Sequence, residues 1–376
     1  MEEKKVRSSN IELLRIVAML MIVIYHIVCH CVIPQLTDSA SIERMGNGYF
    51  NVPAFYKKLL IVDLIDPWGQ ISNAIFILIS GYFMVSKGKS VNLVKSAKKL
   101  FIQLVFSIAV LSIVSNVIFH MWGNTSFISM EYFKSVNGRS WYIGYYFVVI
   151  LIGALFINEY LLKLDKKGYT IFLTVSFVIT QFTWSAGLLN GFSSGLNLLL
   201  TGIFLYSLGG FIRKYDSFRN VRLYVYFLII LVLNIFICVS NYNVTMTNIE
   251  VFNRDTPDGI FYQSVISYGN SNFIVLVIAV CIFEIFRRIK MPNSRIINFI
   301  GAGTFMVYLV HDNKFFYSLW GMKDWIVDIY NTPYRFMLDL LKWGLATFAA
   351  GLAVYILYLA IAKVFEKTKW IFYKKV

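Results

Sequence analysis

Long apolar segments recur along the whole chain and alternate with shorter polar connections. A helix needs about 20 apolar residues to cross the hydrocarbon core of a bilayer, which is about 30 Å thick. Segments that approach this length lie near residues 11–33, 70–86, 97–119, 141–162, 169–186, 194–212, 222–240, 270–287, 297–314 and 338–362. The pattern therefore predicts an all-α, polytopic membrane bundle of about ten transmembrane helices.

The placement of basic residues supports this count and predicts an orientation. Cytoplasmic loops are richer in Lys and Arg than loops on the other side of a membrane. If the N-terminus is cytoplasmic, most Lys and Arg residues fall in the two termini and in alternate loops on the cytoplasmic side. An odd number of helices would break this alternation. We therefore expect both the N-terminus and the C-terminus in the cytoplasm.

Composition agrees with a membrane protein and narrows its partners. Hydrophobic residues make up 58% of the chain and charged residues only 15%, whereas soluble domains carry about 25% charged residues. The net charge of +15 is distributed over alternate loops, so it does not indicate a nucleic-acid partner. Without repeats, low-complexity tracts or a soluble segment, residues 1–376 are expected to form one membrane domain with no appended soluble domain.

The first predicted helix carries three ionisable residues, Glu12, Arg15 and His26. Such residues are costly inside a membrane and commonly functional. Arg15 and His26 are eleven residues apart, which places them about 20° from each other around the helix and about 16 Å apart along it. One elongated ligand could contact both side chains. The alternatives are that Arg15 only extends to the interface and that a neighbouring helix satisfies His26.

This spacing suits a long donor with a charged head and a reactive end, such as acyl-coenzyme A. Arginine binds phosphates in bidentate geometry, and a neutral histidine commonly removes a proton from an attacking hydroxyl. Glu12, three residues before Arg15, could orient the guanidinium. We therefore expect a donor-binding site with Arg15 at the phosphates, Glu12 orienting Arg15, and His26 at the thioester.

His26, Cys29 and His30 also have a spacing that could bind a metal ion on one side of a helix. A zinc site normally has a further ligand or an open position for water. No acidic or cysteine residue elsewhere in the sequence repeats the spacing, so we expect no metal. His30 is more simply read as a residue near the outer end of the helix.

Four stretches of the chain resemble the acyltransferase-3 family. They are NIELLRIVAMLMIVIYH (10–26), with an Arg, ten residues and a His, IFILISGYFM (75–84), SWYIGYYF (140–147) and IGAGTFMVYLVH (300–311). The resemblance implies transfer of an acyl group, commonly acetyl, from a cytoplasmic coenzyme A donor to hydroxyls of envelope glycans. It also implies that His26 is the catalytic histidine and Arg15 a donor-binding residue.

The chain departs from that family in the segment between its second and third predicted helices. Where many relatives carry arginines, it has Lys95, Lys98 and Lys99. These lysines share one helical side and could meet the donor phosphates as point charges. The ordinary excess of positive charge on the cytoplasmic side explains them equally well.

His311 is the second histidine predicted at depth. Measured from the inner ends of their helices, His311 and His26 both lie about 20 Å along the axis, which suggests a shared cavity. His311 could bind the acceptor or stabilise a developing oxyanion, with Asp312 orienting an imidazole. Alternatively, it only ends a helix at the interface.

The expected protein is an O-acyltransferase of the plasma membrane, in contact with membrane lipid. It would move an acyl group from acetyl-CoA or another acyl-CoA to a hydroxyl of a cell-surface polysaccharide, an envelope glycan or a lipid-linked sugar. A transporter or flippase of a glycan or lipid-linked intermediate is the main alternative, and a glycan polymerase is another. Aromatic residues of the outer loops, such as Trp320 and Trp325, could stack on a sugar or anchor the protein at the interface. The sequence does not indicate the oligomeric state.

Overall fold

The computed structural model describes residues 7–37, 57–121, 141–193, 195–255 and 272–373, and within these ranges all regular structure is helical. The helices in chain order are α1 (Ser9–Ile27), η1 (Val28–Val32), α2 (Ile33–Thr37), α5 (Leu60–Ile65), α6 (Trp68–Met84), η2 (Val85–Ser90), α7 (Leu93–Met121), α9 (Trp141–Ile152), η3 (Gly153–Ile157), α10 (Asn158–Lys163), α11 (Lys166–Gln181), α12 (Thr183–Phe192), α13 (Leu196–Tyr215), α14 (Leu223–Asp255), α15 (Phe273–Arg288), α16 (Arg295–His311), α17 (Lys314–Gly321), α18 (Trp325–Asn331) and α19 (Pro333–Tyr373). The predicted all-α class is confirmed.

Seven helical stretches of the described chain are long and apolar enough to cross a membrane. They are 9–36, 60–90, 93–118, 141–163, 196–215, 223–244 and 333–365. The predicted span 169–186 crosses a 75° bend between α11 and α12, and this bent pair would make an eighth span. The predicted spans 270–287 and 297–314 correspond to α15 and α16, which have 16 and 17 residues. A count of about ten stays a prediction.

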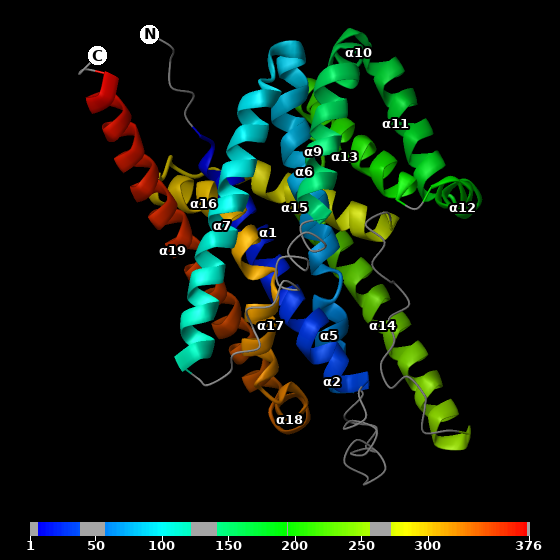
Figure 1. Ribbon diagram of the computed structural model, residues 1–376. Helices are drawn as coiled ribbons and strands as arrows, with labels where there is room; N and C mark the ends of the chain where they lie inside the picture. The colour runs from blue at the N-terminus through cyan, green and yellow to red at the C-terminus, as the bar shows by residue number, and fades with distance from the viewer. Residues whose placement is uncertain (1–6, 38–56, 122–140, 194, 256–271, 374–376) are drawn as a thin grey trace.

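The first described helix begins, and the last one ends, on the same side of the bundle (Figure 1). In Figure 1 the start of α1, the turn between α10 and α11 and the end of α19 lie at the upper end. At the lower end lie α2, α18 and the end of α14. An even number of crossings produces this arrangement. Which end faces the cytoplasm stays a prediction from the basic residues.

The centre of the bundle is built around α1 and α6. Helix α1 packs against α6, α16 and α19, and α6 also packs against α13 and α15. In the most apolar part of each span, 50% of the span that begins with α1 is buried and 72% of the span that contains α5 and α6. Only 11% of the span in α14 is buried. The helix with three ionisable residues is therefore an interior helix, and α14 turns most of its side chains outward.

Two glycines allow helices of this centre to touch. A Cβ added at Gly81 of α6 would lie 1.8 Å from the carbonyl oxygen of Tyr206 in α13. A Cβ at Gly301 of α16 would lie 2.4 Å from Oε2 of Glu12 in α1. Small residues permit such close contact between membrane helices. The Ser80-Gly81-Tyr82 motif therefore has a packing role at the α6–α13 contact.

Trp320 and Trp325 serve neither purpose proposed for them from the sequence. Both indoles are 0% exposed, within α17 and α18 at the lower end of the bundle. The Trp320 indole donates to Oγ1 of Thr347 over 3.2 Å, and the Trp325 indole donates to the carbonyl of Trp320 over 2.9 Å. They are packed inside the protein, so they can neither stack on a sugar nor anchor at an interface.

Candidate functional site

Helix α1 changes its geometry one residue after His26. It is a regular α-helix from Ser9 to Ile27 and continues as a π-helical turn from Val28 to Val32. Short π-helical turns inside α-helices occur frequently at functional sites. Arg15 and His26 both lie on the regular part, so the expected 100° per residue applies to them.

One side of α1 lines a half-open cavity of about 240 Å³. Arg15, Met19 and Ile22 line this cavity, and His26 is the next residue on the same side, four positions after Ile22. His26 itself is outside the cavity wall. The side of α1 that carries Arg15 and His26 therefore faces the interior of the bundle.

Five helices line this cavity. Its wall contains a cluster of basic side chains and a pair of side chains with hydroxyls. The basic side chains are Arg7, Arg15 and Lys99. Ser80 of α6 and Tyr146 of α9 form a hydrogen bond of 2.8 Å between their hydroxyls. The remaining wall residues include Phe76, Tyr142, Ile143, Ala302, Thr304, Phe305 and Tyr308. Such a cavity suits a ligand with an anionic end and an apolar or amide-containing arm.

Glu12 lies beside the basic group and pairs with Arg15. Its Oε1 accepts a 3.1 Å hydrogen bond from Nη1 of Arg15 and lies 3.5 Å from Nη1 of Arg7. The Glu12 side chain is 7% exposed, compared with 29% for Arg15. The carboxylate therefore holds the guanidinium in place and does not itself face an anionic ligand.

The three lysines proposed as donor-binding residues are separated by the structure. Lys99 lines the cavity with Arg15. All three lysines are exposed residues of α7, but Lys95 and Lys98 are absent from the cavity wall. The structure instead adds Arg7, which the sequence offered only as one of several basic residues before the first helix.

The two predicted histidines, His26 and His311, are in direct contact. Nδ1 of His26 and Nε2 of His311 are 2.8 Å apart, and the two rings stack with their centroids 4.9 Å apart. His311 is fully buried, and the His26 side chain is 16% exposed. Tyr308, which lines the cavity, places its ring 5.6 Å from the His311 ring. The cavity and the histidine pair are therefore neighbours.

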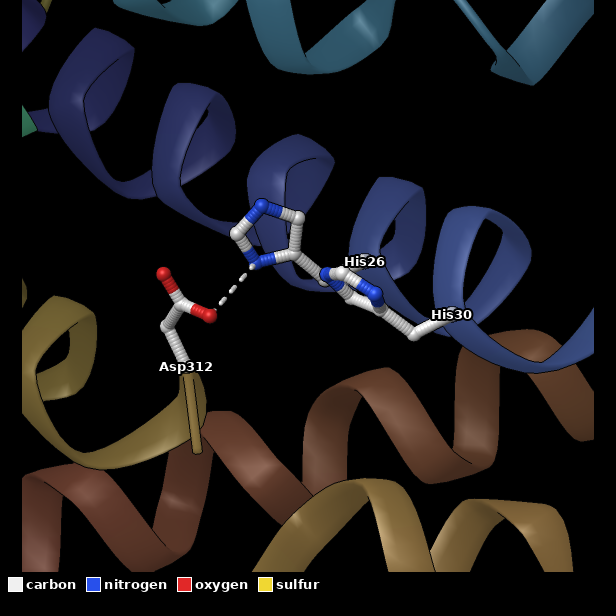
Figure 2. Close-up of side chains that lie close together, drawn as sticks. All are labelled: His26, His30 and Asp312. Carbon is white, nitrogen blue, oxygen red and sulfur yellow. Dashed lines mark ion pairs between the residues drawn. The ribbon is translucent and has the colours of Figure 1, made fainter. Parts of the chain in front are cut away.

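Asp312 lies beside His26 and not beside the far nitrogen of His311. Its Oδ1 is 4.0 Å from Nδ1 of His26 and accepts a hydrogen bond from the hydroxyl of Tyr317. Figure 2 shows the carboxylate directed toward the His26 ring from α16. The His311 ring is oriented by two backbone carbonyls, of Val307 and Tyr308, at 3.1 and 2.8 Å from its Nδ1.

His30 completes a group of possible metal ligands. One ligand atom each from His26, His30 and Asp312 can be chosen so that all lie within 4.8 Å of one another (Figure 2). Two imidazoles and a carboxylate are the donors of many zinc sites. The spacing of residues in the first helix indicates no carboxylate for such a site, because Asp312 is remote from that helix in the chain. Nδ1 of His26, which lies 4.0 Å from Oδ1 of Asp312, is also the nitrogen bonded to His311.

The fold and this arrangement define a polytopic helical membrane protein with basic residues and paired imidazoles along one interior helix. The family model described as "Acyltransferase domain" (Acyl_transf_3) matches residues 8–365. The chain thus belongs to the acyltransferase-3 family, and it is a multi-pass membrane acyltransferase. No curated protein and no solved structure matches it.

Proposed function

We propose that this protein is an O-acyltransferase of the plasma membrane. It moves an acetyl group from cytoplasmic acetyl-CoA to a hydroxyl of a cell-surface polysaccharide or of an envelope glycan precursor, which includes lipid-linked sugars. One observation carries the proposal. The Arg15 side of α1 lines a cavity with three cations, and the same side ends at the His26–His311 pair.

The basic group supports a donor with several phosphates. Arg7, Arg15 and Lys99 carry three positive charges, and Glu12 compensates only one of them. An anion of high charge density would neutralise the remainder, as phosphates bound by Arg and Lys do. The cavity of about 240 Å³ is smaller than the roughly 300–1,000 Å³ of pockets that enclose drug-sized ligands. It therefore suits the narrow arm of the donor, with the nucleotide outside near the cations.

The position of His26 supports acyl transfer at the far end of that arm. An imidazole at this point can take the proton of an acceptor hydroxyl as the oxygen attacks the thioester carbonyl. The side chain of His26 is 16% exposed, and His30, one helical turn further, is an exposed residue. The acceptor would approach from the His30 side and the donor from the Arg15 side.

The test is acyl transfer by washed membranes that contain the protein and receive radiolabelled acetyl-CoA. We expect label in the glycan fraction and release of free coenzyme A. His26→Ala should abolish both, whereas His120→Ala, at a histidine that has no part in the proposal, should retain them. A transporter, a flippase or a glycan polymerase would work without acetyl-CoA. Full labelling by His26→Ala at normal protein levels would refute the proposal.

A second measurement addresses the acceptor. Mass spectrometry of surface glycans from cells with and without the protein should show acetyl groups that depend on the protein and on His26. Unchanged acetylation of surface glycans would remove this acceptor class. It would leave the acyl-transfer assay to decide whether the enzyme acts on another hydroxyl compound.

A further inference from the structure

The backbone determines which nitrogen of His311 carries its proton. Nδ1 of His311 lies 2.8 Å from the carbonyl oxygen of Tyr308 and 3.1 Å from that of Val307. A carbonyl oxygen can only accept a hydrogen bond, so Nδ1 must be the protonated nitrogen. In neutral His311, Nε2 is then an acceptor. Its burial disfavours a second proton, because a charged imidazole would have to be desolvated.

The tautomer of His311 in turn determines that of His26. Nε2 of His311 is an acceptor and lies 2.8 Å from Nδ1 of His26, so Nδ1 of His26 must donate. Neutral His26 then carries its single proton on Nδ1. Its basic nitrogen is Nε2, which lies on the opposite side of the ring from Nδ1, the nitrogen joined to Asp312 in Figure 2.

The geometry points to His311 as a positioning residue that makes Nε2 of His26 the nitrogen that accepts the proton in catalysis. This inference rests on the proposed acyl transfer and assigns His311 a role different from binding the acceptor or an oxyanion. We call the two successive hydrogen bonds, from His311 to the Tyr308 carbonyl and from His26 to His311, the relay. Each member fixes the proton of the next, as hydrogen-bonded partners fix the tautomer of a histidine.

The reaction balances with this relay. Nε2 of His26 takes the proton of the acceptor hydroxyl while the oxygen forms a bond to the thioester carbonyl carbon. The carbon–sulfur bond then breaks, and the proton on Nε2 passes to the sulfur to give the free thiol of coenzyme A. The products are one acetyl ester and one coenzyme A. His311 keeps its proton on Nδ1 throughout.

Asp312 supplies the charge that the intermediate state of His26 requires. With a proton on both nitrogens, His26 is a cation, and Oδ1 of Asp312 lies 4.0 Å from its Nδ1. Tyr317 donates to the same carboxylate oxygen and keeps it directed toward α1. In a low-dielectric site, a fixed carboxylate at this distance stabilises the imidazolium.

Two substitutions of similar polarity test the relay. His311→Gln places an amide oxygen near the position of Nε2, where it can accept from His26, whereas the shorter His311→Asn places its polar atoms near Nδ1. General base catalysis contributes about 10²–10⁴-fold, so we expect His311→Asn to lower kcat by roughly 10²-fold or more. His311→Gln should retain kcat within about tenfold, with KM for acetyl-CoA nearly unchanged in both variants. Equal kcat in the two variants would overturn the inference.

The tautomer can also be read directly in the unaltered protein, which covers the case in which a variant fails to fold. The chain has 4 histidines, so side-chain ¹⁵N resonances can be assigned by single substitutions. The ¹⁵N shift distinguishes a protonated from an unprotonated ring nitrogen. We expect His26 and His311 to be protonated at Nδ1 and unprotonated at Nε2. The opposite tautomer of either ring would overturn the relay even if acyl transfer is established.

Metal analysis of the purified protein gives the competing outcome. If His26, His30 and Asp312 hold a divalent ion, the protein would contain about one equivalent of zinc, and His30→Gln would lose it. An ion bound through Nδ1 of His26 would prevent that nitrogen from donating to His311, and an ion bound through Nε2 would occupy the nitrogen proposed as the base. Bound zinc with that dependence would refute the relay, and protein free of zinc with full activity supports it. Neither result alters the test with His26→Ala.

Discussion

Replacement of Arg15 by glutamine should weaken donor binding and lower the stability of the protein, and a double variant separates the two effects. Arg15 contacts the cavity and also pairs with Glu12, whose side chain is 7% exposed. A lost hydrogen bond to a charged group costs about 1.5–3 kcal/mol. At 1.4 kcal/mol for each factor of ten, Arg15→Gln should weaken the binding of coenzyme A by roughly 10- to 150-fold.

The same substitution should also lower thermal stability. It leaves the buried Glu12 carboxylate with Arg7, at 3.5 Å, as its remaining cation among the described residues. Complete loss of a partner from a buried ion pair costs about 3–5 kcal/mol. Because Arg7 remains and the Arg15 side chain is 29% exposed, the loss should be smaller, about 1–3 kcal/mol.

The double variant Glu12→Gln, Arg15→Gln is the control. It removes both charges, so no carboxylate is left buried, and the melting temperature in lipid nanodiscs should return toward that of the unaltered protein. The affinity for coenzyme A, measured by equilibrium dialysis with the same nanodiscs, should stay low. Unchanged affinity in Arg15→Gln would refute a donor-binding role. Recovery of affinity together with stability in the double variant would show that Arg15 acts only through the fold.

Two further predictions compare matched residues, two lysines of α7 and then one glycine each from α6 and α9. Lys99→Gln should weaken coenzyme A binding by about 3- to 10-fold, less than Arg15→Gln because Lys99 is an exposed residue. Lys95→Gln should have no effect, since only Lys99 lines the cavity; equal effects would point to general surface charge. Gly81→Ala should destabilise the protein by about 1–3 kcal/mol, because its Cβ would meet the Tyr206 carbonyl, and thermal unfolding in nanodiscs measures this. Gly144→Ala, with nothing within 4 Å of the added Cβ, should be neutral or stabilising, and an equal loss there would contradict the packing argument.

Much of the site could be predicted because it depends on one regular helix and on depth in a membrane. The 3.6-residue period placed Arg15 and His26 on one side of α1, and the structure has Arg15, Met19 and Ile22 along one cavity wall. Counting residues from the inner ends placed His26 and His311 at the same depth, and they are in contact although 285 positions apart in the chain. Both steps need only helix geometry.

The parts that could not be predicted depend on departures from regular helices. Asp312 follows the last residue of α16 with φ −88° and ψ 72°, outside helical values, so the helical period does not indicate where its side chain points. The π-helical turn that contains His30 also places this residue differently, relative to His26, from a regular α-helix. The sequence therefore indicated both histidines and an Asp312 that orients an imidazole, but not that this carboxylate faces His26 or that His26, His30 and Asp312 form a possible three-ligand group.

Hydropathy also failed to distinguish the centre of the bundle from its edge. The most apolar parts of the spans that contain α1 and α14 have the same mean hydropathy of 2.6. Yet 50% of the first and 11% of the second are buried. Lipid and protein interior are equally apolar, so apolar residues are accepted in both places. Ionisable residues are accepted only where a partner or a cavity compensates their charge. Glu12, Arg15 and His26 mark α1 as interior, whereas residues 223–244 contain no Asp, Glu, Lys, Arg or His. In this fold the few charged positions, more than the many apolar ones, determine which helix lies at the centre.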